Sequence, residues 1–128
     1  MGERSAESWG NFPHERRRLY DLIADTGANG VIFLTGDVHF SEISKTDEGP
    51  YPLFDFTSSP LAQYPTGSTG WELCMNSYRI SETYEKDNFG LVEIDWEARP
   101  SPKITLKLTG MDGSKVFEHN ISLGSLQR

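Results

Sequence analysis

The hydrophobic residues of this chain follow two kinds of pattern, one helical and one typical of strands. Leu19, Leu22 and Ile23 recur at the three- and four-residue spacing of one helical face. Pro13 suits the first turn of a helix, and Gly27 suits a left-handed stop. The sequence therefore predicts one main helix that begins near Pro13 and ends just before Gly27.

Two short apolar runs predict strands in the first half of the chain. Val31 to Leu34 are four consecutive hydrophobic residues, a pattern typical of a central strand that is buried on both faces. Tyr51 to Thr57 alternates hydrophobic side chains between a proline and a Ser-Ser-Pro sequence. A helix that leads into a buried strand indicates an α/β layer structure, in which ligands collect at the carboxyl ends of the strands.

The last forty residues alternate hydrophobic and polar side chains, which predicts a half-exposed antiparallel meander. Its hydrophobic positions are Val92, Ile94, Trp96, Ile104, Leu106, Leu108, Phe117, Ile121 and Leu123. Met111 to Gly113 supplies turn chemistry between its second and third strands. Ala62 to Asp87 has no clear period, and we expect a long ordered excursion there that includes one helical turn. The predicted fold class is α/β, with one helix on a mixed sheet that the meander completes.

Composition and charge narrow the classes of function. The 128 residues suit one domain, and the formal net charge of −7 disfavours binding to nucleic acid or anionic lipid. Cys74 is the only cysteine, so an internal disulfide and a thiolate zinc cluster are excluded, and we expect a small buried residue there. No apolar run suits a membrane span, and the first ten residues lack the apolar core of a signal peptide, so the localisation is unknown.

The candidate chemistry centres on Gly36-Asp37-Val38-His39, directly after the first predicted strand. Gly36 lets the backbone turn tightly, so the Asp37 carboxylate and the His39 imidazole can project toward one point and bind a divalent ion. Spacing alone favours another interpretation, in which Asp37 caps the turn and His39 is a hydrogen-bonded loop histidine.

Three other polar residues have structural interpretations that we favour. His14 stands at the start of the helix, where we expect it to face solvent or the cap. His119 alternates with hydrophobic residues on the core-facing side of its strand, which favours a structural histidine. Arg16 can reach a phosphate in principle, but in a run of three arginines a solvated helix face is favoured.

Several segments, in order, resemble the C-terminal part of the alkaline phosphatase D (PhoD-like) family of calcineurin-like metallophosphoesterases. The segment WGNFP (residues 9–13) is similar to the start of the family's helix. The segment VIFLTGDVHFSE (31–42) resembles its last metal-binding strand and loop. The segments YPLFDFTSSPL (51–61) and NFGLVEID (88–95) resemble the next strand and the start of the closing hairpin.

The resemblance implies a phosphomonoesterase or phosphodiesterase whose two metal ions stabilise the charge that develops on a phosphoryl group. Asp37 and His39 occupy the family's final ligand turn, and His39 is the firmer ligand, because the wider superfamily commonly has a histidine where Asp37 stands. The resemblance implies divalent or trivalent ions, with calcium and iron as candidates, and an extracytoplasmic location. It assigns no catalytic side chain to this chain.

Three further residues, Glu42, Ser58 and Ser59, keep two interpretations each. Glu42 lies within reach to orient His39 or a water molecule at the site, or it is a solvated loop carboxylate. Ser58 and Ser59 are candidates for phosphate contact, but a simple turn is favoured because no Gly-x-Ser-x-Gly elbow surrounds them.

The number of metal ligands sets the expected domain organisation. A two-metal site needs on the order of six to eight protein and water ligands, and the sequence before Gly36 does not supply them. We therefore expect residues 1–128 to be the C-terminal part of a PhoD-like domain, one side of an α/β/β/α sandwich. It would act on a phosphate ester only with an N-terminal half or a partner chain, and its uncovered sheet predicts self-association. The alternative is a stand-alone β-rich binding or interaction domain with at most one bound ion.

Overall fold

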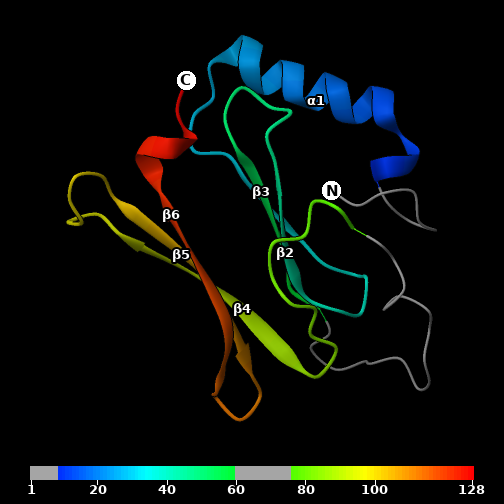
Figure 1. The fold of residues 1–128 in the computed structure, drawn as a ribbon, viewed down its shortest axis with the longest axis vertical. Helices are drawn as coiled ribbons and strands as arrows, with labels where there is room; N and C mark the ends of the chain where they lie inside the picture. Colours follow the sequence, from blue (N-terminus) through cyan, green and yellow to red (C-terminus); the bar gives the residue numbers. More distant parts are fainter. Residues whose placement is uncertain (1–8, 60–75) are drawn as a thin grey trace.

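The computed structural model describes residues 9–59 and 76–128, which form one helix and two three-stranded sheets in three layers (Figure 1). Helix α1 (Pro13–Thr26) covers one face of the first sheet, and the second sheet lies against the other face. This arrangement confirms the predicted α/β class, with one main helix and a C-terminal meander. The meander forms a sheet of its own, so the expectation that it completes a single mixed sheet is wrong.

Helix α1 follows a short 3-10 turn, η1 (Trp9–Asn11), and has both predicted ends. Pro13 lies in its first turn, and Gly27 ends it with a left-handed φ of 65°. The buried helix residues are Tyr20 and Ile23, whereas Leu22 is 57% exposed. The buried face is therefore rotated away from Leu22, which the helical spacing had placed in the core.

The first sheet has the order β1-β3-β2, with β1 (Ile32–Thr35) parallel and β2 (Glu42–Thr46) antiparallel to β3 (Leu53–Thr57). The central strand is β3, which is buried at all five positions. Strand β1 lies at the edge, and its Leu34 is 65% exposed. The prediction that this apolar run is a central strand buried on both faces is wrong, because no other described strand pairs with its outer edge.

Strand β2 was not expected from the sequence. Ile43 is fully buried there, but Ser44 and Thr46 are buried as well, at 1% and 4% exposure. Glu42, before Ile43, is also buried. Because these buried residues are polar, the strand lacks the alternation of hydrophobic and polar residues on which strand prediction depends.

The second sheet consists of β4 (Asn88–Asp95), β5 (Lys103–Gly110) and β6 (Lys115–Ser122), followed by η3 (Leu123–Leu126). The predicted hydrophobic positions of β5 are buried, and Gly113 in the predicted turn has a φ of 81°. The predicted positions of the first meander strand differ: Val92, Ile94 and Trp96 are 42–62% exposed. Strand β4 is an edge strand of this sheet, so its side chains are only partly covered.

The two sheets contact each other through β3. The rings of Phe54 and His119 lie 5.4 Å apart, and a Cβ added to Gly90 would lie only 2.9 Å from Cε1 of Phe56. His119 is half-buried on β6, and burial, followed by the charge of Lys45, lowers its pKa below the ordinary value. This placement agrees with a structural role for His119.

Residues 76–87 have irregular structure and lie along β2, which they contact through the isolated bridges Ser41–Tyr84 and Ser44–Arg79. The rest of the expected excursion, with Cys74, lies in residues 60–75, outside the described part of the chain. The predictions for that stretch therefore stay predictions.

Candidate functional site

The carboxyl ends of β1 and β3 meet at one edge of the first sheet. Thr35 pairs with Thr57, and beyond them the N–H of Ser58 donates to the carbonyl of Thr35 at 3.1 Å. A Cβ on Gly36 would lie 3.7 Å from the carbonyl oxygen of Ser58. Strand β2 begins at the same edge, with Glu42 opposite Thr57. The structure therefore brings the start of the Gly-Asp-Val-His turn, Ser58 and Glu42 to one edge, where α/β folds commonly bind ligands.

The backbone of this turn is unusual at Asp37 and His39. Their φ angles are 69° and 60°, in the left-handed region that costs a non-glycine residue roughly 1–2 kcal/mol, less for aspartate. Gly36 has no positive φ, so the expectation that its backbone freedom makes the turn is wrong. The strain lies instead at the two predicted metal ligands.

The side chains of Asp37 and His39 are accessible. Asp37 is exposed and His39 is half-buried. Among the residues that the structure describes, neither side chain has a hydrogen-bond or ion-pair partner. The interpretation of Asp37 as a turn cap and His39 as a hydrogen-bonded loop histidine therefore finds no supporting contact in those residues.

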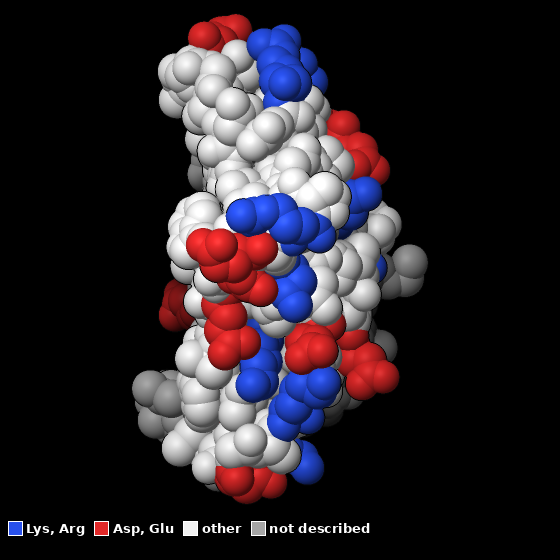
Figure 2. Space-filling view, turned by 90° about the vertical axis from the view of Figure 1, so that its left-hand side faces the viewer, with Lys and Arg blue, Asp and Glu red and all other residues white. Residues whose placement is uncertain are grey.

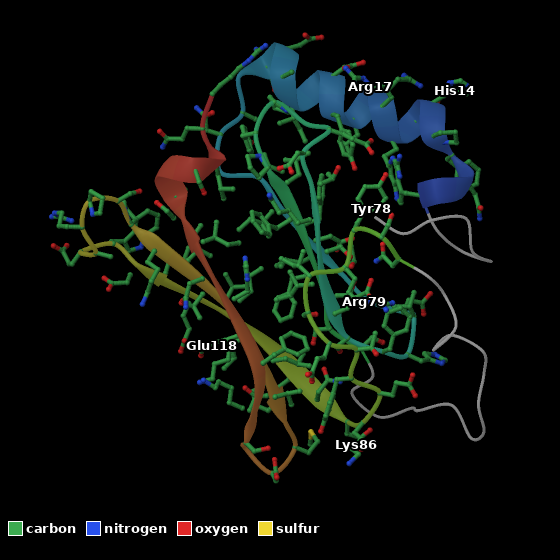
Figure 3. All side chains as sticks on the ribbon, viewed as in Figure 1. His14, Arg17, Tyr78, Arg79, Lys86 and Glu118 are labelled. Atoms are coloured by element: carbon green, nitrogen blue, oxygen red, sulfur yellow. The ribbon has the colours of Figure 1, made fainter. Side chains whose placement is uncertain are left out.

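Glu42 is a buried residue of β2, with 8% of its side chain exposed, so its interpretation as a solvated loop carboxylate is wrong. It forms an ion pair with Arg79, which lies beside β2 (Figure 3), and accepts hydrogen bonds from the Asn76 amide at 2.6 Å and the Ser44 hydroxyl at 3.2 Å. These contacts tie residues 76–79 to β2. A role for Glu42 in orienting His39 stays a prediction.

Ser58 and Ser59 join a hydrogen-bond network beyond β3. The hydroxyl of Ser41 accepts from the N–H of Ser59 at 2.9 Å, and lies 2.8 Å from the Ser59 carbonyl and 2.9 Å from Oδ1 of Asn88. The hydroxyl of Ser58 lies 3.3 Å from the same Oδ1. The contacts suit the favoured interpretation as a turn, and phosphate contact stays a prediction.

Asp55 is a buried carboxylate of β3 that lies beside the end of β1. It is 6% exposed, and its Oδ1 accepts a hydrogen bond of 2.7 Å from the hydroxyl of Thr35, which also lies 2.8 Å from Oγ1 of Thr57. Asp55 faces α1 and lines a cavity of about 100 Å³ together with Tyr20, whose pKa is raised to about 12 by burial. The other lining residues are Trp9, Arg16, Leu19, Phe33 and Thr35.

Arg16 differs from the two arginines that follow it. Its side chain is 17% exposed, against 65% for Arg17 and 76% for Arg18. The guanidinium pairs with Glu48 at 3.4 Å and lies 5.6 Å from the ring centroid of Tyr78, which donates a hydrogen bond to the same carboxylate at 2.6 Å (Figure 3). The interpretation as a solvated helix face is therefore wrong for Arg16 and confirmed for the other two.

Sequence reasoning missed three polar residues that organise this edge, namely Asp55, Arg79 and Asn88. A signal exists for Asp55, because a carboxylate inside an apolar strand indicates a buried hydrogen-bond partner. Asn88 and Arg79 stand in polar sequence, where nothing distinguishes them from solvated residues. Their positions depend on contacts that are distant in the sequence: Arg79 contacts Glu42, and Asn88 contacts Ser41 and Ser58.

The described residues contain no group of three or more His, Cys, Asp or Glu side chains that could hold a metal ion. Asp37 and His39 provide one oxygen donor and one nitrogen donor, which fit divalent and trivalent ions chemically but fill only part of a coordination sphere. His14 is exposed on α1, away from this edge (Figure 3).

The charged surface offers no alternative site on the face shown in Figure 2, where Lys and Arg alternate with Asp and Glu instead of forming a patch of one sign. Within the described ranges, no helix is long and apolar enough to cross a membrane.

Comparison with known proteins identifies one family. The family model for PhoD-like phosphatases matches residues 2–113 of the 128-residue chain, a range that covers α1, the first sheet, β4 and β5. No curated protein and no solved structure gives a significant match. The matched range includes the edge at which β1 and β3 end. The chain belongs to the PhoD-like phosphatase family, whose members are phosphatase-type hydrolases.

Proposed function

We propose that this chain supplies the last ligand turn of a metal-dependent phosphoric-ester hydrolase, with Asp37 and His39 as metal ligands. One observation carries the proposal. In a chain of the PhoD-like phosphatase family, an aspartate and a histidine without hydrogen-bond partners among the described residues have left-handed backbone angles just beyond the end of β1, which is parallel to β3. Strained backbone of this kind concentrates at functional sites.

The chemistry proposed for this edge is that of a two-metal site. Metal ions held there would act as Lewis acids that neutralise the charge of a phosphoryl group. His39, half-buried, provides a nitrogen donor, and Asp37, exposed, provides a carboxylate. Ser58 stands beside Gly36 and is the proposed contact for a phosphate oxygen. Calcium and iron are the proposed metals, by family resemblance.

The remaining ligands are proposed to come from a segment that pairs with the outer edge of β1. No described strand occupies that edge, and Leu34 beside it is 65% exposed. An unpaired strand edge with exposed hydrophobic side chains is a template for another strand. A parallel strand added there would end beside the turn that holds Asp37 and His39, and would complete one side of the α/β/β/α sandwich.

The test is hydrolysis of an aryl phosphate in the presence of divalent metal ions. We expect turnover at background level from the chain alone and metal-dependent turnover after the chain is joined to the N-terminal half of a PhoD-like phosphatase. His39→Ala should abolish the activity of the joined protein, whereas His14→Ala, on the exposed side of α1, should leave it unchanged. Full metal-dependent activity of the chain alone would refute the need for another segment, and activity that survives His39→Ala would refute the ligand role.

A binding or interaction module with at most one bound ion is the second candidate. It is favoured by the absence of a three-ligand cluster in residues 9–59 and 76–128. It predicts that His39→Ala leaves folding unchanged and removes at most one bound ion, and that no joined protein turns over a phosphate ester.

A further inference from the structure

We infer that Asp55 and Asn88 are positioning residues that fix the two ends of the candidate ligand turn, residues 36–40. The inference rests on the proposed role of Asp37 and His39 as metal ligands. Because these two side chains have no partners among the described residues, their directions depend on the backbone of the turn. That backbone is held by the residues on either side of it, Thr35 and Ser41.

The first end is held by Asp55 through Thr35, the last residue of β1. The Thr35 hydroxyl donates to Oδ1 of Asp55 at 2.7 Å and lies 2.8 Å from Oγ1 of Thr57. Asp55 is 6% exposed between α1 and the sheet, where a carboxylate that loses a hydrogen-bond donor is not compensated by bulk water. The end of β1 is therefore fixed to β3 by side chains in addition to the backbone ladder.

The second end is held by Asn88 through Ser41, the residue that follows the turn. Ser41 is fully buried and exchanges two backbone hydrogen bonds with Tyr84, at 2.8 and 3.0 Å. Its hydroxyl lies 2.9 Å from Oδ1 of Asn88, which is 1% exposed and donates from Nδ2 to the carbonyl of Lys86 at 2.7 Å. Asn88 begins β4, so the second sheet fixes this end of the turn.

Fixed ends explain why left-handed φ angles persist at two non-glycine residues. Such conformations survive only where the surrounding structure determines them. Five residues span the distance from Thr35 to Ser41, and both flanking residues are tied by buried polar side chains. Release of either end would let Asp37 and His39 return to common backbone conformations and would turn their side chains away from a shared ion.

The experiment measures amide hydrogen exchange and HN–Hα couplings by NMR in the full chain. Thr35→Val keeps the shape of the side chain and removes the hydroxyl, Thr35→Ser restores the hydroxyl, and Thr105→Val is the matched control, since Thr105 donates to Asn120 on the exposed face of the second sheet. We expect the Ser58 amide to exchange about tenfold faster in Thr35→Val, with changed couplings at Asp37 and His39. Thr35→Ser and Thr105→Val should match the parent chain.

The second end is tested by Asn88→Ala, with Asn120→Ala as the matched control on β6. We expect exchange at Ser41 and Ser59 to rise about tenfold in Asn88→Ala alone. If that variant does not fold, Ser41→Ala removes the same contact with a smaller change in volume. Unchanged couplings at Asp37 and His39 in folded Thr35→Val and in a folded variant of the second end would overturn the inference, as would equal changes in the controls.

The metal dependence of turnover in the joined protein separates a positioning role from an effect on general stability. The Mn²⁺ concentration for half-maximal turnover should rise roughly tenfold in Thr35→Val and return to the parent value in Thr35→Ser. An unchanged Mn²⁺ requirement in Thr35→Val would contradict the positioning role even if the couplings changed. Because the NMR readout does not depend on turnover, an inactive joined protein with a loosened turn would contradict only the proposed function.

Discussion

Strands β1 and β3 are parallel and end at the same edge, but they lie in different environments. Strand β3 is buried at all five positions, including the carboxylate of Asp55, whereas β1 becomes exposed along its length until Leu34 is 65% exposed. Strand β3 has a neighbouring strand on each side and a layer on each face. Strand β1 has one neighbouring strand among the described residues.

The difference shows that burial of a strand depends on its neighbours more than on its own composition. The buried aspartate of β3 accepts a hydrogen bond from Thr35, whereas Leu34 of β1 is exposed because no described residue covers it. The two strands also divide the roles at the site. The exposed strand leads into the candidate ligands, and the buried strand provides Asp55, one of the two residues that we infer fix the turn.

The largest expected effect comes from truncating the same residue type in both strands. Leu53 is fully buried in β3, so Leu53→Ala should lower the free energy of unfolding by about 2–5 kcal/mol. Leu34→Ala in β1 should change it by less than about 0.5 kcal/mol, because that side chain is exposed. Urea denaturation of the two variants gives both values. Similar losses would show that β1 is as well covered as β3.

A smaller effect is expected from adding one methyl group beside β3, at Gly90, or after β1, at Gly36. A Cβ at Gly90 would lie 2.9 Å from the ring of Phe56 on β3, so Gly90→Ala should destabilise the chain by about 1–3 kcal/mol. Gly36→Ala, after β1, is the control, because its Cβ would make an ordinary contact of 3.7 Å. Thermal unfolding compares the two, and equal shifts would contradict the close packing of β4 on β3.

The smallest expected effect is a pH dependence of stability that comes from His119, whose ring packs against Phe54 of β3. The pKa of His119 is lower in the folded chain than the ordinary value of 6.5, so the unfolded chain binds more protons just below that pH. The contribution of neutral His119 to the free energy of unfolding is therefore complete above about pH 6.5, and it is lost as the pH falls toward the pKa of His119 in the folded chain. Denaturation curves across this window should show a decline that His119→Gln removes. His14→Gln is the control, and a decline that persists in His119→Gln would contradict the assignment.

The parts of the fold that the sequence predicted are those with strong local signals. Pro13 and Gly27 bound α1 because their backbone preferences are local, and the alternation of Ile104, Leu106 and Leu108 specified the buried face of β5. The edge position of β1 could not be predicted, because an apolar run has the same sequence whether or not a further strand covers it. Strand β2 escaped prediction because buried serine and threonine look solvated in a sequence.

For the candidate site, the sequence predicted where Asp37 and His39 lie relative to the strands, and their role as ligands stays a prediction. Asp37 and His39 follow a strand, and the structure places them at the expected edge. The source of the strain was not predictable, because a glycine in the turn suggested that Gly36 would adopt the unusual backbone. Asn76 and Arg79, which contact Glu42, and Asn88, which contacts Ser41, lie more than thirty positions away along the chain, so no local pattern indicated these contacts.

If the Gly-Asp-Val-His turn is one part of a metal site that another segment completes, metal affinity should depend on both the second segment and His39. Equilibrium dialysis against Mn²⁺ can compare the chain alone, the chain joined to the N-terminal half of a PhoD-like phosphatase, and the joined protein carrying His39→Ala. We expect no stoichiometric binding by the chain alone, stoichiometric binding by the joined protein, and at least roughly tenfold weaker binding after His39→Ala. Tight stoichiometric binding by the chain alone, or binding in the joined protein that is indifferent to His39→Ala, would contradict the proposal.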